Sequence, residues 1–201
     1  MNTKISHKFS TAAILLIASV AVSGCATSAR SIDSGAELAK AEMTSQEVLV
    51  FGKFTLHRNG ETVSLSDSVF GNAVTMHLRR NGSDARIAGA VGRDGEFAWA
   101  LEPGDYTIAK VSFMNRGERF EPNADFRFTV VADSDTVYIG SIALESTFEY
   151  GYYGLNGTDY SYRIANDCES DCAGRLSRLG LSASAPVVAL PTAESRIVGA
   201  R

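Results

Sequence analysis

The chain has 201 residues, with 19 basic and 23 acidic side chains and a formal net charge of -4 at pH 7. A nucleic-acid partner is not expected, because binding to a phosphate backbone needs a dense basic surface. With 45% hydrophobic and 21% charged residues, the composition is that of a folded protein, and the length fits one domain plus tails.

The N-terminal residues have the pattern of an export signal. A basic start with two lysines precedes an uncharged apolar run, Ala12 to Val22, which is too short for a bilayer span of about 20 residues. The small residues Ser23 and Gly24 follow, as a signal peptidase requires beside its cleavage site. The pattern therefore predicts a removable signal peptide over residues 1–24.

A cysteine occupies the position that this cleavage would leave as the new N-terminus. Val22-Ser23-Gly24-Cys25 resembles the lipobox of bacterial lipoproteins, whose first mature cysteine is linked to diacylglycerol. The resemblance implies lipidation at Cys25 and attachment to a membrane. Ala26 is not the aspartate that retains such lipoproteins of enteric bacteria at the inner membrane, so we expect the outer membrane. The alternative is a plain secretory signal with an incidental cysteine.

The other two cysteines, Cys168 and Cys172, make an even pair once Cys25 is assigned to lipid. Outside the cytosol, two thiols four positions apart are expected to form a disulfide. Free thiols and a metal site are the alternatives. A metal is disfavoured, because thiolate pairs usually need a third strong ligand and no histidine follows Cys172. We expect no metal and no cofactor.

Residues 25–45 are expected to form a lipidated tether. Small polar residues begin it, and Ala36 to Met43 has the pattern of two helical turns with Ser34 as the N-cap. Mostly extended, at about 3.3 Å per residue, the tether would hold the folded part a few tens of ångströms from the lipid headgroups.

From Val48 onwards, short runs rich in β-branched and aromatic residues alternate with turn-forming pairs. These pairs, which supply the positive φ of tight hairpins, are Asn59-Gly60, Asn81-Gly82, Asp94-Gly95 and Asn156-Gly157. The strands expected before Ser146 begin at 48 and then cover 62–65, 73–80, 85–92, 96–101, 105–113, 126–131 and 137–144. Residues 114–125 are expected to form a polar loop. Trp99 lies between apolar neighbours and is expected in the core.

Many short strands about ten residues apart predict a mainly β fold, an antiparallel two-sheet sandwich over residues 46–165, with a closed barrel as the alternative. The stretch Asp94 to Ile108, which contains Leu101-Glu102-Pro103-Gly104-Asp105-Tyr106, resembles the signature of carboxypeptidase-regulatory-like domains, also called transthyretin-like or prealbumin-like. That resemblance implies a Greek-key sandwich. It also implies a corner in which the tyrosine buries its ring while its hydroxyl reaches a partner.

The C-terminal part has a different pattern. In residues 166–181, Asp167 is expected to cap a short helix that carries the cysteine pair and runs to Leu179, with Gly180 ending it. Leu176 and Leu179 are available to contact the sandwich. Residues 182–201 are rich in alanine, serine and proline, which predicts a loosely ordered tail.

No catalytic residues are assigned. The sequence lacks G-x-S-x-G, H-E-x-x-H, P-loop and dinucleotide-binding motifs. Asp133 and Asp135 are interpreted as a hairpin turn rather than a cation site. A hydrolase would require Glu145, Glu149 and Asp159 to meet in space.

One aromatic cluster gives the candidate ligand-binding residues, Tyr150, Tyr152, Tyr160 and Tyr162. If residues 148–153 pair with 159–164 around Asn156-Gly157, the rings form a flat platform suited to a sugar or a protein. The alternative is cross-strand tyrosine pairing that stiffens the hairpin.

These patterns together predict a non-catalytic protein, anchored by lipid in the cell envelope, that acts as a binding or structural module. We expect a protein partner in the envelope. A glycan-binding module is the alternative, and a hydrolase is a third hypothesis. Because the resemblance concerns the fold, it does not fix the role.

Overall fold

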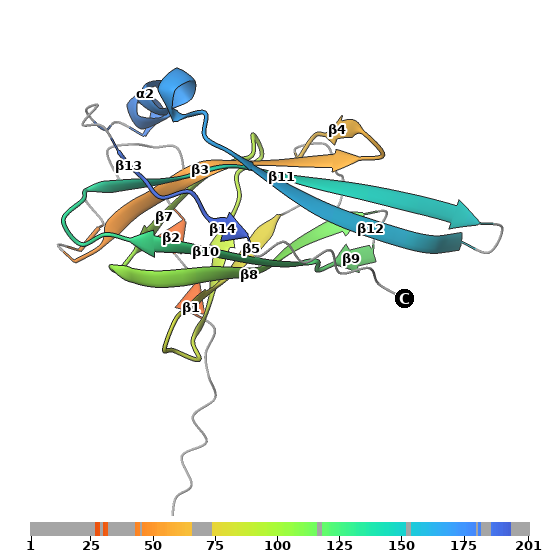
Figure 1. Ribbon diagram of the computed structural model, residues 1–201, viewed down its shortest axis with the longest axis horizontal. Helices are drawn as coiled ribbons and strands as arrows, with labels where there is room; N and C mark the ends of the chain where they lie inside the picture. The colour runs from red at the N-terminus through yellow and green to blue at the C-terminus, as the bar shows by residue number, and fades with distance from the viewer. Residues whose placement is uncertain are drawn as a thin grey trace, which may run out of the picture.

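Two β-sheets pack face to face in the computed structural model (Figure 1). The structure describes residues 27–28, 30–31, 43–44, 46–65, 74–115, 118–151, 154–179, 181 and 186–193. One hydrophobic core contains buried side chains from both sheets. The predicted β-sandwich is confirmed.

Sheet A contains seven strands. In spatial order they are β1 (Thr27–Ser28), β6 (Arg86–Ala90), β5 (Thr75–Arg80), β8 (Gly104–Asn115), β10 (Asn123–Val130) and β14 (Thr192–Ala193), with β9 (Glu118–Phe120) paired to β8. Sheet B also has seven. Their order is β12 (Gly154–Ala165), β11 (Thr136–Gly151), β3 (Val48–Arg58), β7 (Glu96–Leu101) and β2 (Arg30–Ser31), with β4 (Glu61–Val63) on β3 and β13 (Val187–Val188) on β11.

Most neighbouring strands are antiparallel, as predicted, but the central pair of sheet B is not. β3 and β11 run parallel, in a register that extends from Leu49 opposite Thr136 to Arg58 opposite Ser146. Parallel neighbours need a long connection, and here the chain passes through strands of sheet A before it returns as β11.

Three of the four predicted turns are present. Asn59 and Gly60 have φ of 48° and 84°, and Gly82 and Gly95 have φ of 79° and 83°. The fourth turn was predicted wrongly, because Asn156-Gly157 lies inside β12. The hairpin reverses between Gly151 and Gly154, which pair with each other, so β11 continues through Ser146 as one strand of 16 residues.

The polar loop predicted over residues 114–125 is largely strand. β8 extends to Asn115, β9 pairs back onto it, and β10 begins at Asn123. The packing of Phe120 explains this pairing. Its ring stacks on the ring of Phe113 with the centroids 5.7 Å apart, and it makes a T-shaped contact with Phe148 with the centroids 5.3 Å apart. Burial of that ring against both sheets favours the extra pairing.

The core confirms two predictions about aromatic residues. Trp99 is fully buried, and its indole Nε1 donates to the Ala90 carbonyl oxygen at 2.9 Å. Tyr106 is buried beyond the Pro103-Gly104 corner, and its hydroxyl donates to the Glu102 carbonyl oxygen at 2.8 Å. Each aromatic side chain therefore buries its ring and satisfies its polar atom.

Helix α2 (Cys168–Arg178) covers part of the outer face of sheet B, as Figure 1 shows above β3 and β11. A second, smaller core lies beneath it and contains the buried residues Leu49, Phe51, Ala98, Tyr138, Cys172 and Leu176. Leu179 also packs there, so the predicted helix and its contacts are confirmed. β3 is consequently apolar on both faces at its start.

Short strands lie within both terminal segments, which were predicted as a tether and a tail. After Cys25, β1 pairs with β6 in sheet A and β2 pairs with β7 in sheet B. At the other end, β13 pairs with β11 in sheet B and β14 pairs with β10 in sheet A. The helix predicted over Ala36 to Met43 falls almost entirely outside the described residues.

Gly89 tests how closely β6 packs on the core. A Cβ at this position would lie 2.6 Å from Cε2 of Trp99 and 2.9 Å from Cδ1 of Leu78. We therefore expect Gly89→Ala to lower the free energy of unfolding by about 1–3 kcal/mol through overpacking. Urea denaturation measures the loss. The control Ala88→Ser, on the outer face of the same strand, should change stability by less than about 0.5 kcal/mol, and equal losses for both variants would contradict the expectation.

Candidate functional site

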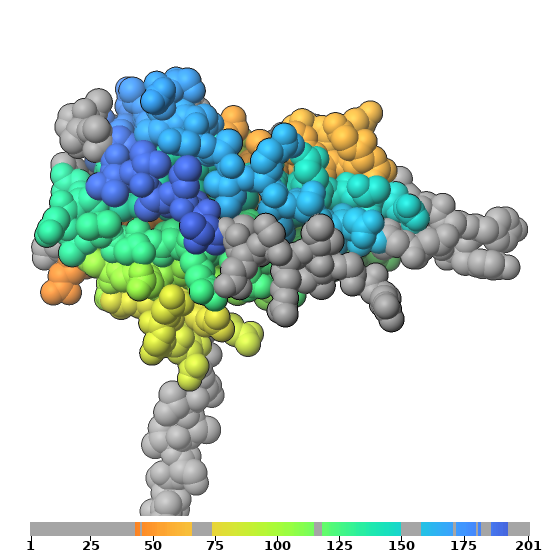
Figure 2. Space-filling view, viewed as in Figure 1, coloured from red at the N-terminus to blue at the C-terminus, as the bar shows by residue number. Residues whose placement is uncertain are grey.

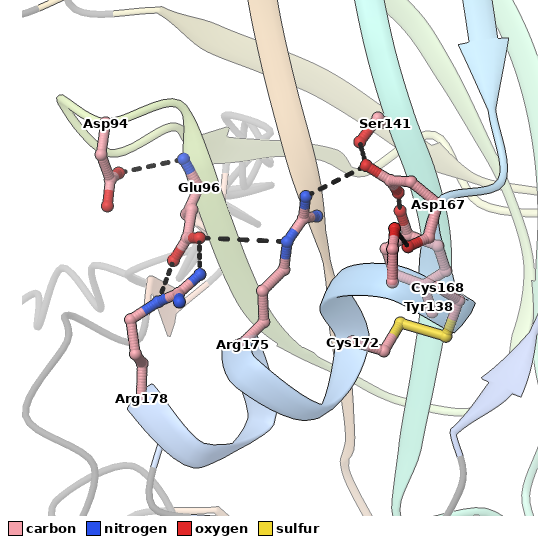
Figure 3. Close-up of polar contacts among 10 residues, drawn as sticks. Asp94, Glu96, Tyr138, Ser141, Asp167, Cys168, Cys172, Arg175 and Arg178 are labelled. Atoms are coloured by element: carbon pink, nitrogen blue, oxygen red, sulfur yellow. Dashed lines mark hydrogen bonds and ion pairs between the residues drawn. A yellow bond between two sulfur atoms is a disulfide. The ribbon is translucent and has the colours of Figure 1, made fainter.

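A buried cation lies between α2 and sheet B (Figure 3). Arg175 is 2% exposed, and its Nη2 donates to Oδ2 of Asp167 at 3.3 Å. Its Nε lies 3.9 Å from Oε1 of Glu96, and its guanidinium carbon lies 5.8 Å from the centre of the Tyr138 ring. Two carboxylates and an aromatic face thus compensate the charge that burial removes from water.

Three hydrogen-bond donors contact the carboxylate of Asp167. Its carboxylate accepts hydrogen bonds from the hydroxyl of Tyr138, from Oγ of Ser141 at 2.6 Å and from Arg175. The pairing of β3 with β11 shifts register between Tyr138 and Ser141, and Gly140 between them has φ of 95°. A bulge of this kind adds a residue to one strand, so both hydroxyls lie on the outer face, towards the helix.

The start of α2 differs from the predicted cap. Asp167 occupies the N-cap position, but its side chain makes no capping hydrogen bond, because its oxygens are used by Tyr138, Ser141 and Arg175. A disulfide joins Cys168 to Cys172, with the two Cα atoms 4.5 Å apart. The predicted disulfide is confirmed.

The far end of α2 is held by a second ion pair. Glu96 accepts hydrogen bonds from Nη2 and Nε of Arg178 (Figure 3). Glu96 therefore contacts both Arg178 and the buried Arg175. This polar cluster was not predicted from the sequence. The signal for it was an arginine on the same helical face as Cys172 and Leu176, a position that faces the sheet.

Two of the four candidate tyrosines point into the sandwich. The ring of Tyr160 makes T-shaped contacts with the rings of Phe113 and Phe148, with centroid separations of 6.3 Å and 6.4 Å. Tyr162 meets the edge of Phe126 at 4.9 Å, and its hydroxyl donates to the Pro122 carbonyl oxygen at 3.3 Å. These rings close the core between β12 and sheet A, so they are neither an exposed platform nor a cross-strand tyrosine pair.

The predicted partners of the tyrosines also differ. Tyr160 lies opposite Ser146, and Tyr162 lies opposite Leu144. The side chain of Tyr150 and all of Tyr152 fall outside the described residues. Burial raises the pKa of Tyr160 to about 12, and burial raises the pKa of Tyr162 as well. Both hydroxyls are therefore neutral at physiological pH.

An open hollow of about 680 Å³ lies at one end of the sandwich. Its lining includes Arg80 and Glu102, which form an ion pair at 2.5 Å, and the Asp133 to Asp135 turn. Oγ of Ser134 in that turn donates to the Val131 carbonyl oxygen at 2.9 Å, which agrees with the hairpin-turn interpretation. Within the described residues, no group of three or more histidine, cysteine or acidic side chains is arranged to hold a metal ion.

Three carboxylates considered for hydrolysis lie on the outer face of the β11–β12 hairpin. Asp159 pairs with Thr147, between Glu145 and Glu149 on the neighbouring strand. Glu145 accepts a hydrogen bond from Arg163 at 2.6 Å, while Glu149 and Asp159 are exposed. A general acid needs a carboxyl that burial keeps protonated, so the exposure of this group does not favour the hydrolase hypothesis.

The predicted lipidation site, Cys25, precedes the first described residue. Among the described residues, no helix has the length and apolar character needed to cross a bilayer. The signal peptide over residues 1–24 and the lipid on Cys25 stay predictions.

No protein-family model and no curated protein matches the chain. Two solved structures are similar to parts of it. A DUF3823 family protein from Bacteroides ovatus has 19% identity and a TM-score of 0.28, with 59% of this chain and 57% of that one covered. A DUF3823 family protein from Parabacteroides merdae has 18% identity and a TM-score of 0.29, with 62% of each chain covered. The chain thus spans less than two thirds of either structure, and these TM-scores assign neither fold nor function.

Asp167→Asn tests the polar cluster beneath α2. The amide keeps the shape of the side chain but removes the charge that compensates Arg175. Because the Asp167 side chain is 35% exposed, we expect a loss of about 2 kcal/mol, below the range for a fully buried pair. Denaturant unfolding measures it, with Glu169→Gln, an exposed acid on the same helix, as the control. Equal stability of the two variants would show that Arg175 does not depend on Asp167.

The raised pKa of Tyr160 predicts loss of stability in alkali. The folded state holds this proton more tightly than the unfolded chain, so its contribution is present below about pH 10 and is lost as the pH rises towards 12. Tyr160→Phe keeps the ring and removes the ionisation. We expect this variant to lose less stability than the parent between about pH 10 and 12, measured by urea midpoints. Ser161→Ala is the control, and a Tyr160→Phe curve parallel to that of the parent would refute the prediction.

Proposed function

We propose that this chain is a lipid-anchored protein of the cell envelope that acts by binding or by supporting an assembly. The observation that carries the proposal is the place of Cys25, which ends a short apolar run and directly follows Ser23 and Gly24. Acyl chains on this cysteine would bind a membrane with about 0.8 kcal/mol per buried CH₂, and more than one chain would make the attachment stable.

The use of polar side chains in the fold supports a binding or structural role. Asp167, Arg175 and Glu96 hold α2 against sheet B through contacts with one another and with Tyr138 and Ser141. In these contacts the charged side chains beneath α2 have a structural role. We propose that the anchored protein is located at the outer membrane and that a protein partner in the envelope binds its folded part.

The glycan-binding alternative loses its main support. Tyr160 and Tyr162 contribute their rings to the core, whereas a sugar platform needs exposed aromatic faces. A hydrolase would rest on Glu145, Glu149 and Asp159, two of which are exposed. The proposal therefore gives preference to a non-catalytic protein that recognises another envelope component.

Metabolic labelling with radioactive palmitate tests the anchor. The parent chain should incorporate the label and stay with the membrane fraction, and Cys25→Ser should do neither. The double variant Cys168→Ser/Cys172→Ser is the matched control, because it removes two thiols and keeps Cys25, so it should label like the parent. Equal labelling of Cys25→Ser and the parent, or none in the parent, would reject the proposed function.

A further inference from the structure

A row of arginines crosses the outer face of sheet A. Arg79 on β5 lies directly opposite Arg86 on β6. On its other side Arg79 pairs with Thr107 of β8, which in turn pairs with Arg127 of β10. With neighbouring strands about 4.8 Å apart, the three cations follow one line across four strands. All three side chains are exposed.

This arrangement is unfavourable for the isolated sheet. Like charges directly opposite each other on antiparallel strands destabilise the pairing, and Arg79 and Arg86 form such a pair. Among the described residues, no carboxylate makes an ion pair with Arg79, Arg86 or Arg127. The row therefore carries uncompensated positive charge in a chain whose net charge is -4.

Two carboxylates next to the row are already engaged. Asp105, one row away on β8, accepts a hydrogen bond from Oγ1 of Thr129 at 2.7 Å. On the other side of the row, Glu121 accepts a hydrogen bond from Lys110 and forms an ion pair with Arg119 at 2.8 Å. In the part of the chain that the structure describes, the three arginines make no ion pair with a carboxylate, and the partner that suits them is an anion from outside the chain.

The chain ahead of β1 leads to the same place. Thr27 pairs with Ile87, the residue after Arg86, and β1 runs parallel to β6. Cys25 precedes Thr27 by two residues, a separation that spans at most about 7 Å. An acyl group on Cys25 would therefore enter the membrane beside the Arg86 end of the row. Figure 2 shows the segment around β5 and β6, in yellow, projecting from the body on this side.

We propose that the outer face of sheet A binds the phosphate groups of the lipid surface that holds the acylated Cys25, through Arg79, Arg86 and Arg127. Guanidinium groups suit this role, because their planar donors match phosphate oxygens and stay charged at any physiological pH. The inference rests on the proposed lipidation and adds an orientation to it. Sheet A faces the headgroups, and sheet B with α2 faces away.

Chemical modification of arginine tests this orientation. The acylated full chain, purified from membranes, is placed on vesicles of phosphatidylcholine or on vesicles that also contain anionic phosphatidylglycerol, and is treated with phenylglyoxal. Peptide mass spectrometry measures the modification rate of each arginine. Each basic residue near an anionic surface favours binding by on the order of fivefold. We therefore expect Arg79, Arg86 and Arg127 to be modified severalfold more slowly on the anionic vesicles. Arg163, on sheet B and paired with Glu145, should react equally on both.

A pair of matched variants separates the row from net charge. Arg79→Gln/Arg86→Gln and Arg93→Gln/Arg163→Gln remove the same two charges, but Arg93 and Arg163 are exposed outside the row. Arg127 serves as the reporter in both. We expect its protection on anionic vesicles to be lost in the first variant and kept in the second.

Each other result overturns the inference. Equal modification rates on both vesicle types, or slowing of Arg163 as great as that of the row, would refute the orientation. Protection by inorganic phosphate alone, to the same extent, would mean a site for a soluble anion. Protein that carries an acyl group but shows no protection would reject this inference and leave the proposed function standing, whereas protein without an acyl group would reject both.

Discussion

The parallel pairing of β3 with β11 is the contact on which the rest of the structure depends. Both faces of this pair are buried at its start, because Val50 and Val137 point into the sandwich while Phe51 and Tyr138 lie beneath α2. Strands covered on both sides are continuous apolar runs, which explains the sequence Val48 to Phe51. β7 and β12 extend this pair to either side, so sheet B and the seat of the helix have one common centre.

The bulge in that pair determines where the polar cluster forms. Gly52 lies against it, and a Cβ there would be 2.5 Å from the carbonyl oxygen of Gly140. Two glycines are thus needed for the close approach of the strands. Without the extra residue, Ser141 would point into the core, and Asp167 would lose one of its donors. A backbone irregularity in β11 therefore supports the charge on Arg175 in α2.

Features that depend on neighbours in sequence could be predicted, and features that depend on distant pairing could not. The turn at Asn59-Gly60, the burial of Trp99 and the helix with its disulfide all follow from local patterns. The inward direction of Tyr160 could not be inferred, because it depends on the register of β12 against β11, and the glycine pair at 156 and 157 suggested another reversal point. The arginine row became visible only when the pairing was known.

The short strands after Cys25 determine how strongly a charged membrane would attract the folded part of an anchored chain. A free tether of about twenty residues reaches roughly 66 Å when extended, whereas charges are screened over about 8 Å at physiological ionic strength. On such a tether the arginines would gain little from lipid phosphates. With β1 paired to β6, Cys25 precedes Thr27 by two residues, a separation that spans at most about 7 Å, which is within the screening length. The pairing of β1 with β6 would thus hold the arginine row of sheet A within the distance at which it interacts with lipid phosphates.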